Sequence, residues 1–152
     1  MVMAYYPGPF GCWQIGCEDG YVVWLKCVPE CGEENCPSPL SDTVYGQLCE
    51  YLAGRRQALD FPCRPKGTAF QQSVWQELRK IPFGAVRTYG QIAGSIGRPK
   101  ACRAVGAANR QNPIWIAIPC HRCVGADGSL TGYAGGLEMK QALLTLEGRS
   151  VK

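Results

Sequence analysis

Two runs of β-prone residues near the start of the chain predict a hairpin. The first covers residues 10–16 and the second residues 20–27, and both contain aromatic and β-branched side chains, which favour strands. The Glu-Asp-Gly sequence at 18–20 lies between them and is typical of a tight turn. Residues 28–41 are rich in proline, glycine, cysteine and acidic side chains, and we expect a loop there.

Helical periodicity first appears after this loop. Ser41 or Asp42 is expected to cap a helix that runs to about Ala53, and Gly54 is expected to stop it. The apolar stripe of this helix consists of Val44, Leu48, Tyr51 and Leu52.

Four further helices are predicted in the second half of the chain. Thr68 is expected to cap the first of them, and Thr88 a shorter second one. Residues 100–109 form the third, and residues 137–146 form the last, after a glycine-rich loop. The inward side chains are expected to be Phe70, Val74 and Leu78 in the first, Ile92, Ala93 and Ile96 in the second, and Ala101, Ala104, Val105 and Ala108 in the third.

The second and third of these helices are separated by a Gly-Arg-Pro break at 97–99, and two short helices joined in this way are typical of a helix-turn-helix. The helix at 100–109 is slim, and the long side chains in and beside it are Arg103 and Arg110. A helix that reads the major groove usually offers several polar side chains to base edges. We therefore expect this helix to approach the minor groove, about 6 Å wide, although the same alanines would also pack tightly in a small core.

An apolar run at 114–118 leads directly into Pro119, Cys120 and His121. We expect a buried strand that ends in a turn and holds the thiol rigidly at the edge of the core. A thiol needs a nearby base or cation to be a good nucleophile at neutral pH, and His121 is the only histidine of the chain. By itself the pair is equally compatible with a nucleophile and with a buried cysteine beside a surface histidine.

Composition narrows the class of protein. With 46% hydrophobic and 18% charged residues the chain is an ordinary globular protein, and neither a membrane span nor a secretory signal is expected. Residues 1–65 carry four basic and eight acidic side chains, a net charge of −4, whereas residues 66–152 carry twelve and four, a net charge of +8. We expect two lobes with these bounds, joined by a basic connector, and a polyanionic partner for the second.

Ten cysteines in 152 residues raise the question of disulfides and of zinc. Without a secretory signal we expect a reducing compartment and mostly free thiols. Cys27, Cys31 and Cys36, with Cys12 or Cys17 as a fourth ligand, are the one candidate zinc set. They lack the paired knuckle of structural zinc sites, so independent free cysteines are the preferred interpretation.

The second half of the chain also carries a series of motifs in a fixed order. They are TAF at 68–70, VW at 74–75, IPFG at 81–84, TYG at 88–90, RPKACRAVG at 98–106, NP at 112–113, IPCHR at 118–122, GYAGGL at 132–137 and LEG at 146–148. In order and spacing, residues 68–148 closely resemble the O6-alkylguanine-DNA alkyltransferases. The N-terminal half fits that family's variable lobe only in general style.

The resemblance implies an α/β (α+β) fold, in which a ribonuclease-H-like N-terminal lobe packs on a winged helix-turn-helix lobe. It implies stoichiometric repair of DNA, in which the alkyl group of O6-alkylguanine, or of O4-alkylthymine, moves to Cys120 in a single turnover. No cofactor and no metal is expected. The partner would be double-stranded DNA bound through its minor groove, and the protein a cytoplasmic monomer, associated with the nucleoid when bound to DNA.

Four residues match the family's catalytic positions. The resemblance implies that Cys120 accepts the alkyl group and that His121 acts as the base, through a water molecule. It also implies that Glu147 orients the histidine and that Asn112 braces the active-site loop.

Other residues match positions that contact DNA or the flipped base. Arg103 would fill the base stack, and Tyr89 would press on the backbone and contact the flipped guanine. Further DNA contacts are expected from Ala101, Arg110 and Arg122. The substrate pocket is expected to be lined by Tyr89, Tyr133, Ala134, Cys123, Trp115 and Asn109.

Cys123 departs from the pattern, because the family usually has Val or Ile there. It is expected either to replace an apolar side chain or to oxidise with Cys120 and disable the protein. Trp115 and Asn109 leave the preferred size of the alkyl group open. There are two alternatives to an alkyltransferase. One is a protein that recognises alkylated bases without removing the adduct, which would lack the acceptor cysteine. The other is a cysteine hydrolase or thiol redox protein, which would leave Arg103 and Tyr89 unexplained.

Overall fold

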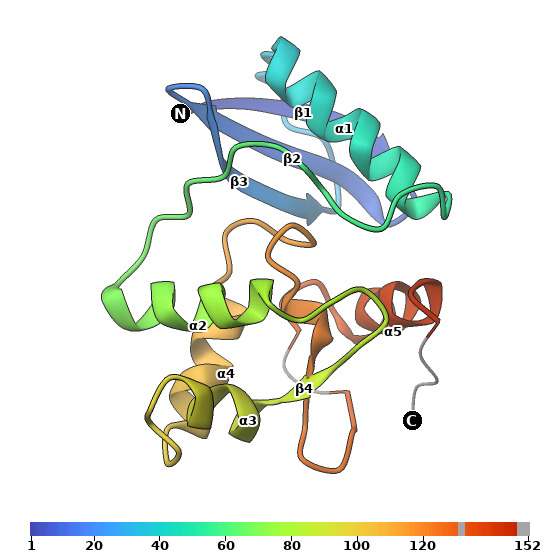
Figure 1. Cartoon of the computed structure of the whole chain (residues 1–152). Coiled ribbons are helices and arrows are strands. Elements are labelled where there is room, and N and C mark those ends of the chain that lie inside the picture. The colour runs from blue at the N-terminus through green and yellow to red at the C-terminus, as the bar shows by residue number, and fades with distance from the viewer. Residues whose placement is uncertain (131–132, 149–152) are drawn as a thin grey trace. The chain divides into compact units, whose positions relative to one another are not determined.

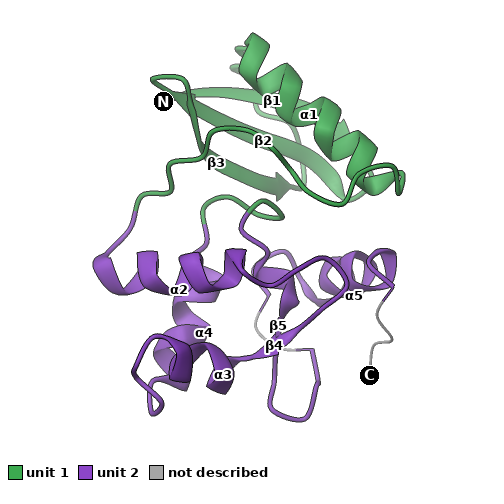
Figure 2. Ribbon diagram, in the orientation of Figure 1, with its two compact units in different colours: residues 1–66, 113–117 green, residues 67–112, 118–152 purple. Residues whose placement is uncertain are grey.

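The computed structural model describes residues 1–130 and 133–148, and its mixture of strands and helices confirms the α/β class (Figure 1). The chain divides into two compact units (Figure 2). Unit 1 consists of residues 1–66 and 113–117, and unit 2 of residues 67–112 and the chain from 118 onward. No helix of the described residues is long and apolar enough to cross a membrane.

The return of residues 113–117 to unit 1 differs from the sequence prediction, which assigned them to the second lobe. Backbone hydrogen bonds explain the difference. The N–H of Leu25 donates to the carbonyl of Pro113 at 2.8 Å, and the N–H of Trp115 donates to the carbonyl of Leu25 at 2.8 Å. The segment therefore continues the sheet of unit 1 beyond its last strand.

Unit 1 is built on an antiparallel sheet of three strands in the order β1 (Val2–Gly8), β2 (Gly11–Glu18) and β3 (Tyr21–Val28). The predicted hairpin between β2 and β3 is confirmed. Asp19 and Gly20 at its tip have φ angles of 53° and 79°, and positive φ at both central residues matches the right-handed twist of the flanking strands. The strand β1 was not predicted. Of the other two strands, β1 pairs only with β2 and therefore lies at an edge of the sheet. An edge strand tolerates Pro7, which has no N–H to donate.

Helix α1 (Pro39–Leu52) contacts β2 and β3, and lies along the sheet of unit 1 (Figure 1). Its first residue lies nearer the N-terminus than predicted. Ser38, not Ser41 or Asp42, is the cap, because its side chain accepts from the N–H of Ser41 while the Ser41 hydroxyl accepts from the N–H of Ser38. Val44, Leu48 and Tyr51 are buried as predicted.

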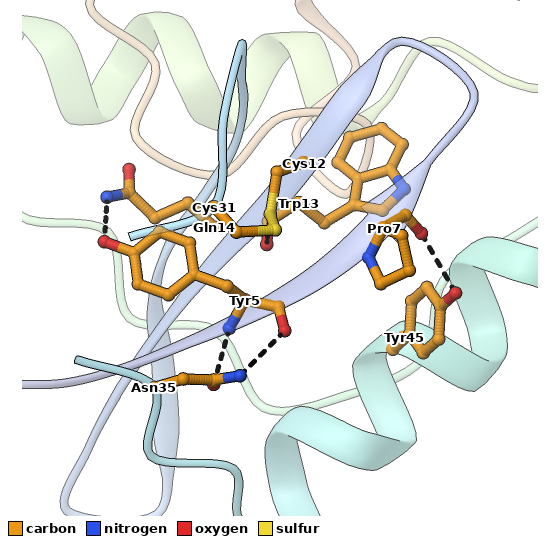
Figure 3. Close-up of a disulfide and its surroundings, with 8 residues drawn as sticks. All are labelled: Tyr5, Pro7, Cys12, Trp13, Gln14, Cys31, Asn35 and Tyr45. Carbon is orange, nitrogen blue, oxygen red and sulfur yellow. Dashed lines mark hydrogen bonds between the residues drawn. A yellow bond between two sulfur atoms is a disulfide. The ribbon is translucent and has the colours of Figure 1, made fainter. Parts of the chain in front are cut away.

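Cys12 and Cys31 form a disulfide (Figure 3), which corrects the prediction of independent free thiols in this region. Cys12 lies at the start of β2 opposite Val28, the last residue of β3. The chain beyond Val28 folds back over Cys12, and strand register therefore brings together two cysteines that are 19 residues apart. The other eight cysteines are free.

Unit 2 contains helices α2 (Ala69–Arg79), α3 (Tyr89–Ser95), α4 (Cys102–Arg110) and α5 (Leu137–Leu146). Thr68 and Thr88 cap α2 and α3 as predicted, each by accepting from the backbone N–H three residues later. Two short strands, β4 (Arg87–Thr88) and β5 (Cys123–Val124), pair in parallel. This pairing places the segment after the candidate nucleophile beside the start of α3.

Two predictions for unit 2 are corrected. Helix α4 buries Val105, Ala108 and Asn109, whereas Ala104 is exposed, so its inner stripe is rotated from the predicted one. The apolar run 114–118 is not a regular strand. Ile114 forms an isolated parallel bridge with Leu25, and the chain then turns at Ile116, whose φ is 69°, a conformation that costs free energy for a β-branched residue.

Candidate active site

Cys120 is the first residue of a single 3-10 turn, η1 (Cys120–Arg122). Pro119 precedes this turn, and the N–H of Cys120 donates to the carbonyl of Ile118 at 2.7 Å. Ile118 is fully buried and Cys120 is 1% exposed. The predicted rigid placement of the thiol is therefore produced by a turn anchored in the core, and not by the end of a strand.

Burial dominates the electrostatics of this thiol. It raises the pKa of Cys120 to about 11, against the opposing effects of a hydrogen bond with the Asn112 side chain, the ammonium of Lys140 and a hydrogen bond with Tyr133. At neutral pH the resting thiol is therefore protonated. A reaction at its sulfur requires a group that removes the proton.

His121 directly follows Cys120 in the chain, and its side chain is fully buried. Its Nε2 lies 2.9 Å from Oε2 of Glu147. Burial lowers the pKa of His121, and the hydrogen bond and charge of Glu147 oppose this effect. The second ring nitrogen, Nδ1, is also buried and makes no hydrogen bond within the part of the chain that the structure describes.

Glu147 caps the C-terminal end of α5 and lies in a charged network. Nε of Arg122 donates to Oε1 of Glu147 at 2.8 Å and Nη2 donates to Oε2 at 2.8 Å, while Nη1 donates to the carbonyl of Ile81 at 2.8 Å. The contact of Arg122 with DNA stays a prediction. In the structure its side chain is only 9% exposed and holds the carboxylate that bonds to the histidine.

Two buried asparagines fix the backbone around the thiol. Nδ2 of Asn112 donates to the carbonyl of Ile118 at 2.8 Å, and Nδ2 of Asn109 donates to the carbonyl of Cys120 at 3.4 Å. These two bonds supply donors to the carbonyls on either side of Pro119, both of which belong to buried residues. Asn109, which was expected at the mouth of a pocket, thus also supports the turn.

Lys140 is a site residue that the sequence analysis missed. It is fully buried, its Nζ donates to the carbonyl of Cys123 at 2.5 Å, and it lies 5.9 Å from the ring centroid of Tyr89. A signal for it exists in the sequence, because Lys140 and Glu147 lie seven residues apart, on the helix face of Leu143 and Leu144. A lysine in such a stripe is directed into the core.

The remaining residues expected in the pocket are placed as follows. Cys123 is fully buried. Tyr133 is 7% exposed, and its hydrogen bond lowers the pKa of the Cys120 thiol. Ala134 is exposed. Trp115 belongs to unit 1, where it bonds to β3, so its pocket role rests on the resemblance alone. Gly132 of the GYAGGL motif lies outside the described residues.

The residues expected to contact DNA are accessible on unit 2, apart from Arg122. Arg103 and Arg110 are exposed on α4. Ala101, the residue that precedes α4, and Tyr89, the first residue of α3, are partly exposed. Residues 103, 107 and 110 lie on one face of α4. That face therefore carries two arginines with only Ala107 between them.

Within residues 1–130 and 133–148, no three histidine, cysteine, aspartate or glutamate side chains cluster in a way that could hold a metal ion.

Comparison with known proteins agrees with these features. A family model described as the DNA-binding domain of 6-O-methylguanine DNA methyltransferase matches residues 69–149. A Methanosarcina acetivorans protein named methylated-DNA–protein-cysteine methyltransferase is 58% identical over 102 residues, which span 67% of this chain and 65% of that relative. The similar region thus covers just under two thirds of that relative's length.

Two further relatives are similar over more of the chain. A constitutive methylated-DNA–protein-cysteine methyltransferase of Bacillus subtilis is 44% identical over 136 residues, which span 89% of this chain and 81% of the relative. A solved structure of Mycobacterium tuberculosis OGT in complex with DNA is 40% identical, has a TM-score of 0.88, and covers 97% of this chain and 92% of its own. On this combined evidence, the chain belongs to the 6-O-methylguanine DNA methyltransferase family.

Proposed function

We propose that this protein repairs DNA by transferring the alkyl group from O6 of an alkylated guanine to the sulfur of Cys120. The observation that carries the proposal is the buried arrangement of Cys120, His121 and Glu147, in which a thiol is followed by an imidazole bonded to a carboxylate. Nucleophile, base and orienting acid are the parts that thiol chemistry needs. The names of the relatives, methylated-DNA–protein-cysteine methyltransferases, supply the substrate class.

The hydrogen bonds of Glu147 determine which nitrogen of His121 acts as the base. The guanidinium of Arg122 is always charged and bonds to both carboxylate oxygens, so Glu147 accepts and Nε2 of His121 donates. In the neutral imidazole the proton then lies on Nε2, and Nδ1 is left as an acceptor. Nδ1 is thus the atom that takes the proton of Cys120, through a water molecule.

The transfer itself forms one bond and breaks one. The sulfur of Cys120 attacks the alkyl carbon, the bond from that carbon to O6 of guanine breaks, and a proton returns to the guanine ring. The products are a thioether and an unmodified guanine. A thioether has no good leaving group, so each chain reacts once.

Helices α3 and α4 are the elements that would bind DNA. A base inside a duplex has to be extruded before its O6 is accessible, at a cost of a few kcal/mol. Arg103 would fill the gap left in the stack, and the slim face between Arg103 and Arg110 suits a minor groove about 6 Å wide. Tyr89, at the N-terminal end of α3, would press on the phosphate backbone, and Tyr133 would line the pocket for the extruded base.

The alternative, a protein that recognises alkylated bases and leaves the adduct in place, is not favoured. Such a protein needs no acceptor thiol and no base. Here Cys120 is present, and five buried side chains, those of Asn109, Asn112, His121, Arg122 and Glu147, are committed to its surroundings.

The proposal is tested by incubating the protein with a duplex that contains one O6-methylguanine, followed by intact-mass measurement and peptide mapping. We expect one methyl group on Cys120 and repair that stops at one equivalent. Cys120→Ala should bind the duplex and gain no mass, whereas Cys49→Ser, which removes an exposed thiol of α1, should react as the parent does. Repeated turnover, or binding without any gain in mass, would overturn the proposal.

A further inference from the structure

Cys123 places a second thiol one turn away from the acceptor. Cys120 and Cys123 have the Cys-x-x-Cys spacing, and the N–H of Cys123 donates to the carbonyl of Cys120. A hydrogen-bonded turn of this type brings its first and fourth Cα atoms within about 7 Å. Disulfides bridge Cα atoms about 4.4–6.8 Å apart, so the backbone of η1 already has a span that a disulfide fits.

The side chains share one environment. Burial raises the pKa of Cys123 to about 12, with a further contribution from Cys120, and the ammonium of Lys140 opposes the effect at both cysteines. Both thiols thus face the same ammonium, that of Lys140. Both side chains are at most 1% exposed, and neither is bonded to another cysteine.

Cys123 takes no chemical part in the proposed alkyl transfer, because Cys120 is the acceptor and His121 the base, and lining a pocket does not require a thiol. An apolar residue would fill its buried position in β5 equally well. DNA repair by Cys120 therefore does not explain why position 123 carries a thiol.

We propose that Cys120 and Cys123 form a dithiol site that hydroperoxides oxidise to an intramolecular disulfide, which reversibly withdraws the acceptor from alkyl transfer. The loss of transfer rests on the proposed function, whereas formation of the disulfide requires only that a small hydroperoxide reaches the buried Cys120.

The reaction balances with the hydroperoxide as the sole oxidant. The thiol of Cys120 gives its proton to His121 and its sulfur attacks one peroxide oxygen. The O–O bond breaks, and a sulfenic acid forms while that proton leaves with the other oxygen as water or an alcohol. The thiol of Cys123 then attacks the sulfur of Cys120, the S–O bond breaks and a molecule of water leaves. The two thiols lose two electrons and two protons, the peroxide is reduced, and an added dithiol reverses the change by exchange.

Proximity gives Cys123 a protective role. A sulfenic acid with no thiol beside it is oxidised further to a sulfinic acid, which ordinary thiols do not reduce. Capture by Cys123 stops Cys120 at a state from which it is recovered.

The test compares the reduced full-length protein before and after treatment with hydrogen peroxide. Non-reducing peptide mapping should show a Cys120–Cys123 link, and uptake of a benzyl group from free O6-benzylguanine should fall by about tenfold or more and return after dithiothreitol. In Cys123→Val and Cys123→Ala, each compared with its own untreated form, Cys120 should become sulfinic acid and uptake should not return. Cys49→Ser should respond as the parent does.

The outcomes separate the two proposals. If the reduced protein takes up no benzyl group, the proposed function fails, and mapping still decides the dithiol site. If Cys120 remains a thiol, becomes sulfinic acid in the parent, or pairs with a cysteine other than Cys123, the dithiol site is overturned.

Discussion

His121 is the only histidine of the chain. The change in the free energy of unfolding between about pH 7 and 5.5 therefore reports on this one side chain of the site. Burial lowers its pKa, while the unfolded chain takes up the proton near about pH 6.5. Below that pH the unfolded state binds more protons than the folded state. The free energy of unfolding should therefore fall with pH from about pH 7 to 5.5, by up to about 1.4 kcal/mol per unit, until the folded-state pKa is reached.

Urea unfolding at several pH values in this window checks the expectation, with His121→Gln as the matched variant. The variant should show a nearly flat dependence, because no other side chain has its ordinary pKa in this range. A parent and a variant with the same slope would contradict the assignment of the effect to His121.

The buried ammonium of Lys140 acts on the thiols of Cys120 and Cys123. The variant Lys140→Met tests whether this charge speeds the reaction of Cys120. Because a cation favours the thiolate, and Lys140 lowers the pKa of Cys120, we expect benzyl uptake to slow by about tenfold to a hundredfold. Stability should also fall, by about 1–3 kcal/mol, because the buried carbonyl of Cys123 loses its donor.

Stopped-flow labelling with O6-benzylguanine measures this rate, and urea unfolding measures the stability. Lys80→Met is the control, because the Lys80 side chain is 68% exposed and pairs with Glu77. Equal slowing in both variants would rule out a local effect of Lys140.

At the scale of elements, local patterns predicted most helices and one hairpin. The helix α5 was predicted with its observed ends, and the caps Thr68 and Thr88 follow from side chains next to their own helices. The strand β1 was missed, since its pairing depends on β2 and its sequence contains Pro7. The turn at Ile116 was also missed, because positive φ at a β-branched residue contradicts local preference.

The same division applies to the candidate site. Cys120, His121 and Glu147 were identified by a resemblance of motifs, whereas the roles of Arg122 and Lys140 depend on which distant backbone and carboxylate they reach. Such partners are set by tertiary packing, which neither spacing nor composition specifies. The Cys12–Cys31 disulfide is set by strand register in the same way.

The exposed face of α4 gives a prediction for a whole element. Ala107 lies between Arg103 and Arg110 on this face and is exposed, so Ala107→Leu thickens the face while the core stays unchanged. If α4 enters the minor groove, affinity for a duplex should fall by about tenfold, while uptake from free O6-benzylguanine stays within about twofold.

Ala69→Leu is the matched control for this variant, because Ala69 is also exposed and lies at the start of α2, outside the face of α4. Fluorescence anisotropy with a labelled duplex compares the two variants. Equal losses of affinity for both would argue against a narrow contact along the face of Ala107.

At the scale of the molecule, charge is concentrated on the half of the sequence that carries the site. Residues 66–152 have a net charge of +8 and residues 1–65 a net charge of −4, so association with DNA should depend steeply on salt. Each phosphate that the protein neutralises contributes about 0.9 to the slope of log affinity against log salt concentration.

Arg110→Ala should reduce this slope by about one unit, equally on alkylated and unmodified duplexes, because a phosphate contact carries no base specificity. Arg55→Ala, which removes an exposed arginine outside unit 2, should leave the slope unchanged. An equal reduction in both variants would show that net charge, and not a contact from α4, governs binding.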